Sequence, residues 1–140
     1  MSNWSGDVNE WNNNVIKEFR ANKGNVSGAY KGARLLLLNT IGAKSGQPRT
    51  TPLGYMADGD RLIVLASVMG APHNPAWYHN LVAHPEVTVE VGGETFDATA
   101  IVAQGAERER LWAKLLGSWP IIADHQAKTT RQIPVIILQR

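Results

Sequence analysis

Two tight connections between strand-like segments constrain this chain more than any other feature. Asp58-Gly59 and Gly92-Gly93 each lie between two segments rich in apolar and β-branched residues. The segments are residues 50–57, 60–67, 87–91 and 94–102. Asp-Gly and Gly-Gly tolerate the positive φ angles that two-residue hairpin loops need. Because so short a connection leaves no room for a crossover, the strands on either side must run antiparallel. The sequence therefore predicts an antiparallel sheet.

The remaining segments add two strands and four helices. The apolar run 35–40 predicts a buried strand, although a helical segment fits it too. Residues 133–138 predict a closing strand, in which Pro134 indicates an edge or bulged position. Helices are expected at residues 7–22, 74–83, 107–116 and 119–129. Asn74 is expected to cap the second helix, with Pro75 at its first position. Six antiparallel strands with flanking helices predict a mainly β, α+β fold: one small closed or half-closed barrel domain over residues 1–140.

Composition excludes several classes of protein. The 140 residues include no cysteine, so disulfides, thiol nucleophiles and iron–sulfur ligation are excluded. Four histidines are present but form no His-Glu-x-x-His pair, and no metal site is expected. No apolar stretch of about 18 residues is present, and the first residues lack the pattern of a signal peptide, so we expect a cytoplasmic protein. Gly-x-Ser-x-Gly is absent, which disfavours a serine hydrolase.

Charge is distributed unevenly along the chain. Residues 1–49 carry seven Lys and Arg against three acids, whereas residues 50–140 carry seven against nine. The cation-rich half suits an anionic ligand or a membrane surface. Nucleic acid is not expected as a partner, because no dense basic stripe with interleaved aromatics occurs. Residues 1–32, a helix and a Gly-rich linker, form a candidate mobile arm for peripheral association with the inner face of a membrane.

The segment Gly42–Pro52 is the strongest candidate for a binding site. It reads Gly-Ala-Lys-Ser-Gly-Gln-Pro-Arg-Thr-Thr-Pro and directly follows a predicted strand. Glycines let successive backbone N–H groups point into one concavity, where Lys44 and Arg49 would add charge for an anion. It is not a Walker A loop, because Ala43 stands where that motif needs glycine. The alternative is a polar hairpin loop with Gly46 and Pro48 as turn residues.

Three blocks together resemble the deazaflavin-dependent nitroreductase family, small actinobacterial reductases that use coenzyme F420. These blocks are residues 42–52, 66–81 and 129–135, in the family's order and at its separations. The resemblance implies a split β-barrel similar to that of FMN-binding oxidases. It also implies a reductase that transfers a hydride from the reduced deazaflavin to a conjugated acceptor such as an enone, quinone or nitro compound.

The resemblance also implies roles for individual residues. Lys44 and Arg49 would hold the phosphate and glutamates of the coenzyme tail. Ser45, Gly46 and Gln47 would add backbone donors there. The ring system would lie between two walls and against a helix. These parts are Thr50, Thr51, Pro52 and Leu53 on one side, Ser67, Gly70 and Ala71 on the other, and Trp77 and Asn80 on the helix.

The acceptor pocket is expected to differ from that of nitroimidazole-reducing relatives. Those relatives carry three tyrosines where this chain has Trp119, Ile122 and His125, so an enone or quinone is the favoured acceptor. Trp119 could stack on a flat substrate. His125 is a weak candidate for the proton donor, since solvent could serve as well. His79 is expected to be a structural histidine.

Two other functions fit the same residues. An FMN-binding oxidoreductase of the same barrel class could use the anion loop for its compact phosphate. A protein that binds the deazaflavin without turnover is the non-catalytic alternative. We expect a monomer or a weak homodimer with a small-molecule acceptor.

Overall fold

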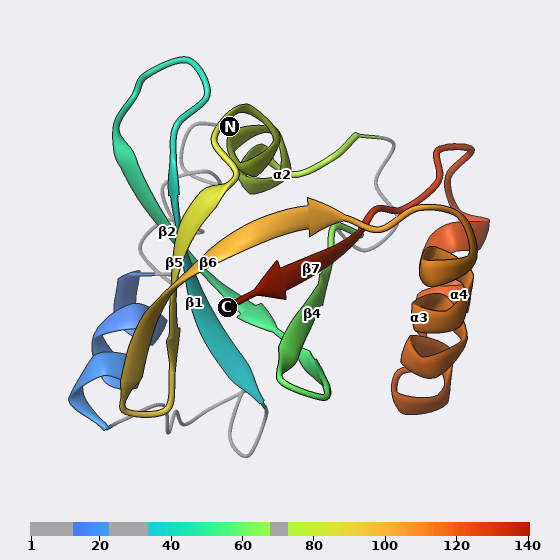
Figure 1. The fold of residues 1–140 in the computed structure, drawn as a ribbon, viewed down its shortest axis with the longest axis horizontal. Coiled ribbons are helices and arrows are strands. Elements are labelled where there is room, and N and C mark those ends of the chain that lie inside the picture. Colours follow the sequence, from blue (N-terminus) through green and yellow to red (C-terminus); the bar gives the residue numbers. More distant parts are fainter. Residues whose placement is uncertain (1–12, 23–33, 68–72) are drawn as a thin grey trace.

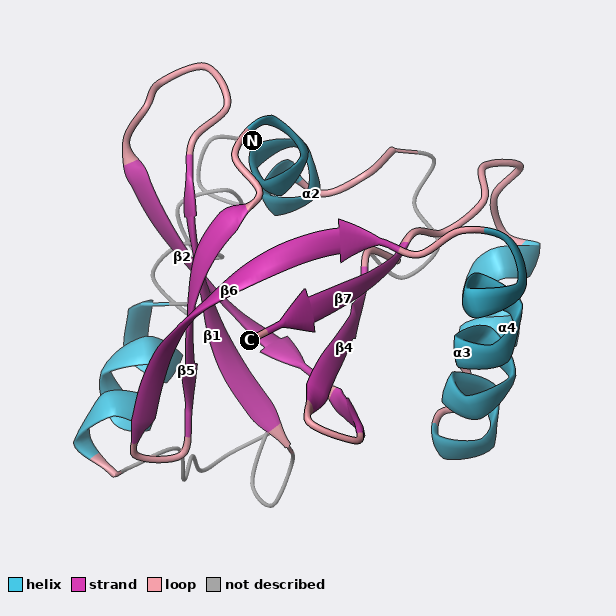
Figure 2. Ribbon diagram, in the orientation of Figure 1, coloured by secondary structure: helices cyan, strands magenta, loops and turns pink. Residues whose placement is uncertain are grey.

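A computed structural model describes residues 13–22, 34–67 and 73–140 (Figure 1). Its centre is one antiparallel sheet of seven strands in the order β2-β1-β5-β6-β7-β4-β3 (Figure 2). The strands are β1 (Leu35–Ile41), β2 (Pro48–Gly54), β3 (Met56–Asp58), β4 (Arg61–Leu65), β5 (Glu86–Val91), β6 (Glu94–Val102) and β7 (Val135–Gln139). The strongly curled sheet forms a half-barrel, as the sequence predicted.

The seventh strand arises because the segment expected as one strand at residues 50–57 breaks at Tyr55. Residues before the break pair with β1, and residues after it pair with β4. The chain therefore passes from one edge of the sheet to the other at Tyr55, whose N–H donates to the Arg34 carbonyl (3.3 Å). Alternating hydrophobicity alone does not reveal such a change of partner.

Both predicted hairpins form, one with a shifted turn. Val91 pairs with Glu94, which leaves Gly92-Gly93 as the connection. Asp58 pairs with Arg61, so the other turn consists of Gly59 and Asp60 rather than Asp58-Gly59. Gly59 has φ of +64°, a conformation that glycine adopts without a steric penalty.

The edge position predicted for Pro134 is wrong. β7 begins one residue later, at Val135, and lies between β6 and β4 inside the sheet. Proline immediately before a central strand removes no ladder hydrogen bond there, because the missing N–H lies outside the paired residues. The Pro134 carbonyl still accepts the Ala66 N–H (3.1 Å).

The helices cover different parts of the sheet. The described part of the N-terminal helix, residues 13–21, packs Ile16 and Phe19 against Leu35 and Leu37 of β1. The other helices are α2 (Ala76–Ala83), α3 (Gly105–Ser118) and α4 (Ile122–Ala127). α2 inserts Trp77 and Leu81 into the main core. α3 and α4 form a separate layer against β3, β4 and β7, at the right in Figure 1, whereas α2 lies at the top.

The N-terminal expectations lie largely outside the described residues. Residues 7–12 of the predicted helix and the linker at 24–32 are among those not described. Within the described ranges, no helix is long and apolar enough to cross a membrane.

Candidate functional site

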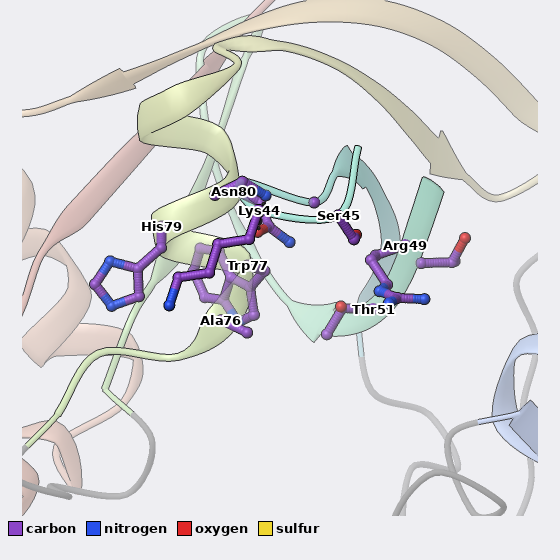
Figure 3. Close-up of a pocket in the computed structure, with 11 residues that line it drawn as sticks. Lys44, Ser45, Arg49, Thr51, Ala76, Trp77, His79 and Asn80 are labelled. Carbon is purple, nitrogen blue, oxygen red and sulfur yellow. Dashed lines mark hydrogen bonds between the residues drawn. The ribbon is translucent and has the colours of Figure 1, made fainter. Parts of the chain in front are cut away.

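A cavity of about 560 Å³ opens between the β1–β2 loop, β2 and α2 (Figure 3). The loop and strand contribute the polar and cationic side of the lining, and the helix contributes Trp77 and a small residue. The lining residues are Gly42, Ala43, Lys44, Ser45, Arg49, Thr50, Thr51, Ala76, Trp77, His79 and Asn80. Segments about 30 residues apart in the sequence thus meet at one site.

The β1–β2 loop is closed by its own hydrogen bonds. Gly42 N–H donates to the Gln47 carbonyl (2.8 Å), and Gly46 N–H donates to the Gly42 carbonyl (3.0 Å). Gln47 N–H donates to Ser45 Oγ (3.2 Å). A Cβ on Gly42 would lie 2.4 Å from Ser45 Oγ, so only glycine fits the first position without displacing that side chain.

These bonds correct the predicted set of backbone donors. The N–H groups of Gly46 and Gln47 are used inside the loop, and neither residue lines the cavity. Lys44 and Ser45 do line it, and their N–H groups donate to no described residue. Two adjacent amides of the loop, on residues that line the cavity, are therefore without a hydrogen-bond partner among the described residues.

The electrostatics of the cavity favour an anion. Lys44 and Arg49 are both exposed, and neither forms an ion pair with any described residue. In Figure 3, Lys44 extends from the loop across α2, whereas Arg49 and Thr51 project from β2. No Asp or Glu occurs among the described residues of the lining. Two cations that no acid of the described ranges neutralises give the cavity a positive potential.

Asn80 joins the two sides of the cavity. Its Oδ1 accepts the Ala43 N–H (2.9 Å), and its Nδ2 donates to Thr40 Oγ1 (3.3 Å). Asn80 and Thr40 are both buried. One side chain on α2 therefore bonds to the last part of β1 and to the first residues of the cation-bearing loop.

The opposite face of β1 and β2 carries a second polar network. Thr50 Oγ1 donates to Asn39 Oδ1 (2.6 Å), and Asn39 Nδ2 donates to Glu90 Oε2 (2.9 Å). Arg20 of the N-terminal helix forms a bidentate pair with Glu90 (3.0 and 2.8 Å). These hydrogen bonds, from Arg20 first and Asn39 second, lower the pKa of the Glu90 carboxyl. Although Thr50 belongs to the lining, its hydroxyl is bonded on this other face.

The cavity brings together half of the residues predicted to bind a coenzyme. Those in the lining are Lys44, Ser45, Arg49, Thr50, Thr51, Trp77 and Asn80. Those that lie outside it are Gly46, Gln47, Pro52, Leu53 and Ser67. Gly70 and Ala71 fall outside the described residues. Trp77 serves two purposes, since it lines the cavity and is also only 7% exposed within the main core.

His79 lines the cavity, although the sequence interpretation treated it as structural. Its side chain is exposed, and Figure 3 shows it projecting from α2 beside Lys44. Ala76, His79 and Asn80 are spaced three and four apart, so they share one face of the helix. That spacing was the available signal, because Asn80 was already assigned to the site.

Ser67 and Asn74 are held by an arginine that sequence reasoning gave no role. Arg131 Nη2 donates to the Ser67 carbonyl (2.7 Å), and Arg131 Nη1 donates to the Ala66 carbonyl (3.1 Å) and to Asn74 Oδ1 (2.6 Å). Asn74 therefore does not cap α2. The N-cap residue is Pro75, with no side-chain hydrogen bond, and the helix begins at Ala76.

The three residues predicted to contact the acceptor lie elsewhere. Trp119 ends α3 and packs on the core beneath α3 and α4, and Ile122 is 3% exposed inside that core. Neither these two nor His125 lines the cavity. They do not form the shared open face that their spacing suggested, because the short helix turns Ile122 inward. His125 Nδ1 is buried and has no hydrogen-bond partner among the described residues.

The chain is similar in sequence to proteins of a known enzyme family. A sequence model of the F420H(2)-dependent quinone reductase family matches residues 11–140. The chain belongs to this family. A quinone reductase of the family from Mycobacterium tuberculosis is 40% identical over 131 residues, which cover 87% of this chain and 85% of the relative. The resemblance inferred from the three sequence blocks is confirmed.

Solved structures agree on the fold of this quinone reductase family. An F420-H2 dependent reductase, FDR-A, is 38% identical with a TM-score of 0.69, and the match covers 76% of this chain and 94% of that one. A second relative, described as a domain-swapped dimer, is 34% identical with a TM-score of 0.72. The match covers 99% of this chain and 98% of the relative. The heme storage protein HutZ of Vibrio cholerae, at 21% identity and a TM-score of 0.56, shares the fold alone. The predicted split barrel is confirmed.

Proposed function

We propose that this chain is a deazaflavin-dependent reductase that passes a hydride from reduced coenzyme F420 to a quinone. The observation that carries the proposal is the cavity at the β1–β2 loop. It combines two cations and two backbone amides, none of which has a partner among the described residues, with a buried tryptophan. Membership of the quinone reductase family supports the same conclusion.

The lining residues fit a flat ring that carries a long anionic tail. Arg49 can form two parallel hydrogen bonds to a phosphate or carboxylate, and Lys44 supplies a mobile point charge. The amides of Lys44 and Ser45 add directed donors beside them. Trp77 offers an apolar surface to a ring.

The coenzyme and the chain have separate roles in this reaction. The coenzyme, when bound, would supply the hydride, since none of the described lining residues is a nucleophile hydrogen-bonded to a base. The chain binds the tail through Lys44 and Arg49 and orients the ring against α2. Orientation lowers the barrier because the reacting atoms are already close when the acceptor arrives.

The acceptor is proposed to be a quinone, with enones and nitro compounds as weaker substrates. Relatives that match most of this chain are named for quinone reduction. His125 is a weak candidate for the proton donor, because its Nδ1 is buried and the residue does not line the cavity. Solvent is the simpler proton source for a reduced quinone.

Titration and turnover test this function. Purified protein should bind reduced coenzyme F420 more tightly than FMN, and added quinone should oxidise the bound coenzyme over many turnovers. Equal affinity for FMN would support the FMN-dependent alternative. Tight binding of the deazaflavin without turnover on any quinone, enone or nitro acceptor would support the non-catalytic alternative.

We also propose that the protein is a monomer or a weak homodimer, with an N-terminal segment able to associate with a membrane surface. One relative is described as a domain-swapped dimer, so exchange of an element between copies is the specific alternative. Light scattering over a range of concentrations separates these states. Sedimentation with anionic vesicles, comparing the unaltered protein with a variant in which Lys17, Lys23 and Lys31 of the segment at residues 1–32 are replaced by glutamate, tests the membrane association.

A further inference from the structure

We infer that Asn80 is a positioning residue that fixes the cation-bearing loop against α2, and that it does so together with Thr40. The inference rests on the proposed function, because the loop is taken to hold the coenzyme tail. It assigns Asn80 a role that goes beyond contact with the ligand, and it gives Thr40, a residue outside the cavity, a part in coenzyme binding.

The hydrogen bonds fix the orientation of the Asn80 amide. Ala43 N–H can only donate, so it must face Oδ1, at 2.9 Å. Nδ2 then faces Thr40 Oγ1, at 3.3 Å. With both ends of the amide engaged and the side chain only 8% exposed, rotation of Asn80 would break two bonds at once. The amide is therefore a rigid link between α2, β1 and the loop.

This link determines which loop amides remain for a ligand. Asn80 takes the N–H of Ala43, and internal bonds take those of Gly46 and Gln47. The amides of Lys44 and Ser45 are the two left between them. Without Asn80, the loop would keep its internal bonds but lose its attachment to α2. The tail-binding groups would then move relative to Trp77, and small displacements of binding groups weaken preorganised sites.

Thr40 provides the decisive test because it is 2% exposed and does not line the cavity. Thr40→Val keeps the shape of the side chain and removes the hydroxyl that holds Asn80 Nδ2. We expect the dissociation constant of coenzyme F420 to rise roughly tenfold, the effect of one lost hydrogen bond. Binding of the same deazaflavin chromophore without phosphate and glutamates should change less than about twofold, since the loop holds only the tail.

Matched variants separate positioning from general destabilisation. Thr88→Val removes a hydroxyl on β5 that bonds to Asp97 on the protein surface and lies outside the cavity, so it should leave both affinities unchanged. Thr40→Ser keeps the hydroxyl and should bind coenzyme F420 as tightly as the unaltered protein. It serves as the test variant if Thr40→Val folds poorly. Asn80→Ala should weaken coenzyme binding at least as much as Thr40→Val. The double variant should be no worse than Asn80→Ala alone, because both changes break the same link.

The outcomes are distinct. Selective loss of coenzyme affinity in Thr40→Val, with the tail-less chromophore unaffected, supports the positioning role, provided that Asn80→Ala weakens coenzyme binding at least as much. Equal weakening of both ligands in Thr40→Val, or a Thr40→Val protein that binds like Thr88→Val, overturns it. Failure of the proposed function shows in the unaltered protein instead: it would bind coenzyme F420 no more tightly than FMN, which also removes the basis of the positioning role, or it would bind coenzyme F420 without turnover, which leaves the positioning role standing.

Discussion

Replacement of Arg49 by alanine is the sharpest perturbation of the proposed coenzyme site. Arg49 lines the cavity, is exposed, and forms no ion pair with any described residue. Its loss therefore removes no ion pair or side-chain hydrogen bond between described residues. The thermal midpoint of the ligand-free protein should change by less than about 2 °C, because isolated surface charges contribute little to stability.

The expected loss of affinity follows from the chemistry of a guanidinium. Hydrogen bonds to charged groups contribute roughly 1.5–3 kcal/mol. Because Arg49 is exposed and water competes for the ligand oxygens, the lower half of that range applies. This corresponds to a rise in the dissociation constant of about 10- to 40-fold. Arg49→Lys keeps the positive charge but cannot form two parallel hydrogen bonds to one ligand group. Its dissociation constant for the coenzyme should therefore lie between those of the unaltered protein and Arg49→Ala.

Fluorescence titration with coenzyme F420 at several salt concentrations measures this loss. Arg34→Ala is the matched control, since Arg34 is an exposed arginine before β1 that lies outside the cavity and makes none of the ion pairs between described residues. The salt dependence of binding should become shallower in Arg49→Ala and stay unchanged in Arg34→Ala. If both variants weaken binding equally, the effect comes from net charge, and the proposed contact at Arg49 is refuted.

Three further variants test other parts of the structure. Arg131→Ala removes the donors to Ala66, Ser67 and Asn74 and should lower the free energy of unfolding by about 2–4 kcal/mol in chemical denaturation. Asp58→Asn should lower the thermal midpoint at pH 7 by about 3–6 °C. Hydrogen bonds from Arg110, Arg61 and Lys114 lower the pKa of Asp58, so this stabilisation is fully present above the pKa of an unfolded carboxyl, and the gap between the two proteins should narrow progressively as pH falls below about 4. Trp119→Ala should lower stability by about 1–3 kcal/mol and leave the apparent KM for quinones nearly unchanged, because Trp119 packs on the core of α3 and α4; a raised KM with unchanged stability would restore it to the acceptor pocket.

The sequence carried enough information for the strands but not for all their partners. Two-residue turns are local, and Val91 and Glu94 pair as the Gly92-Gly93 signal required. The break at Tyr55 depends on both edges of the curled sheet approaching the same point, and a tertiary arrangement of this kind leaves no periodicity in the sequence. The turn at Gly59 lies one residue later than expected, because the local sequence suits either Asp58-Gly59 or Gly59-Asp60 as the turn.

The sequence indicated which residues could bind an anion, but not which of their groups stay available once the loop has folded. The cations Lys44 and Arg49 were found because charge in a Gly-rich loop after a strand is visible in the sequence. The use of the amides was not visible, because the Gly46 and Gln47 N–H groups are satisfied by bonds that exist only in the folded loop. Asn74 was assigned to a cap by the same local reasoning, and Arg131, 57 residues away, takes its side chain instead.

The charge of the first 49 residues overstated the positive potential of the site. Arg20 belongs to that half, yet Glu90 on β5 neutralises it on the opposite face of the sheet. Arg34 lies outside the cavity, which leaves Lys44 and Arg49 as the cations that line it in the described residues. Exposed charges more than about 10 Å apart are largely screened at physiological salt, so distant cations add little to binding. The affinity for an anionic tail therefore depends on two side chains and two amides held in place by Asn80, and salt should weaken binding with the slope of those few contacts rather than that of the whole cation-rich half.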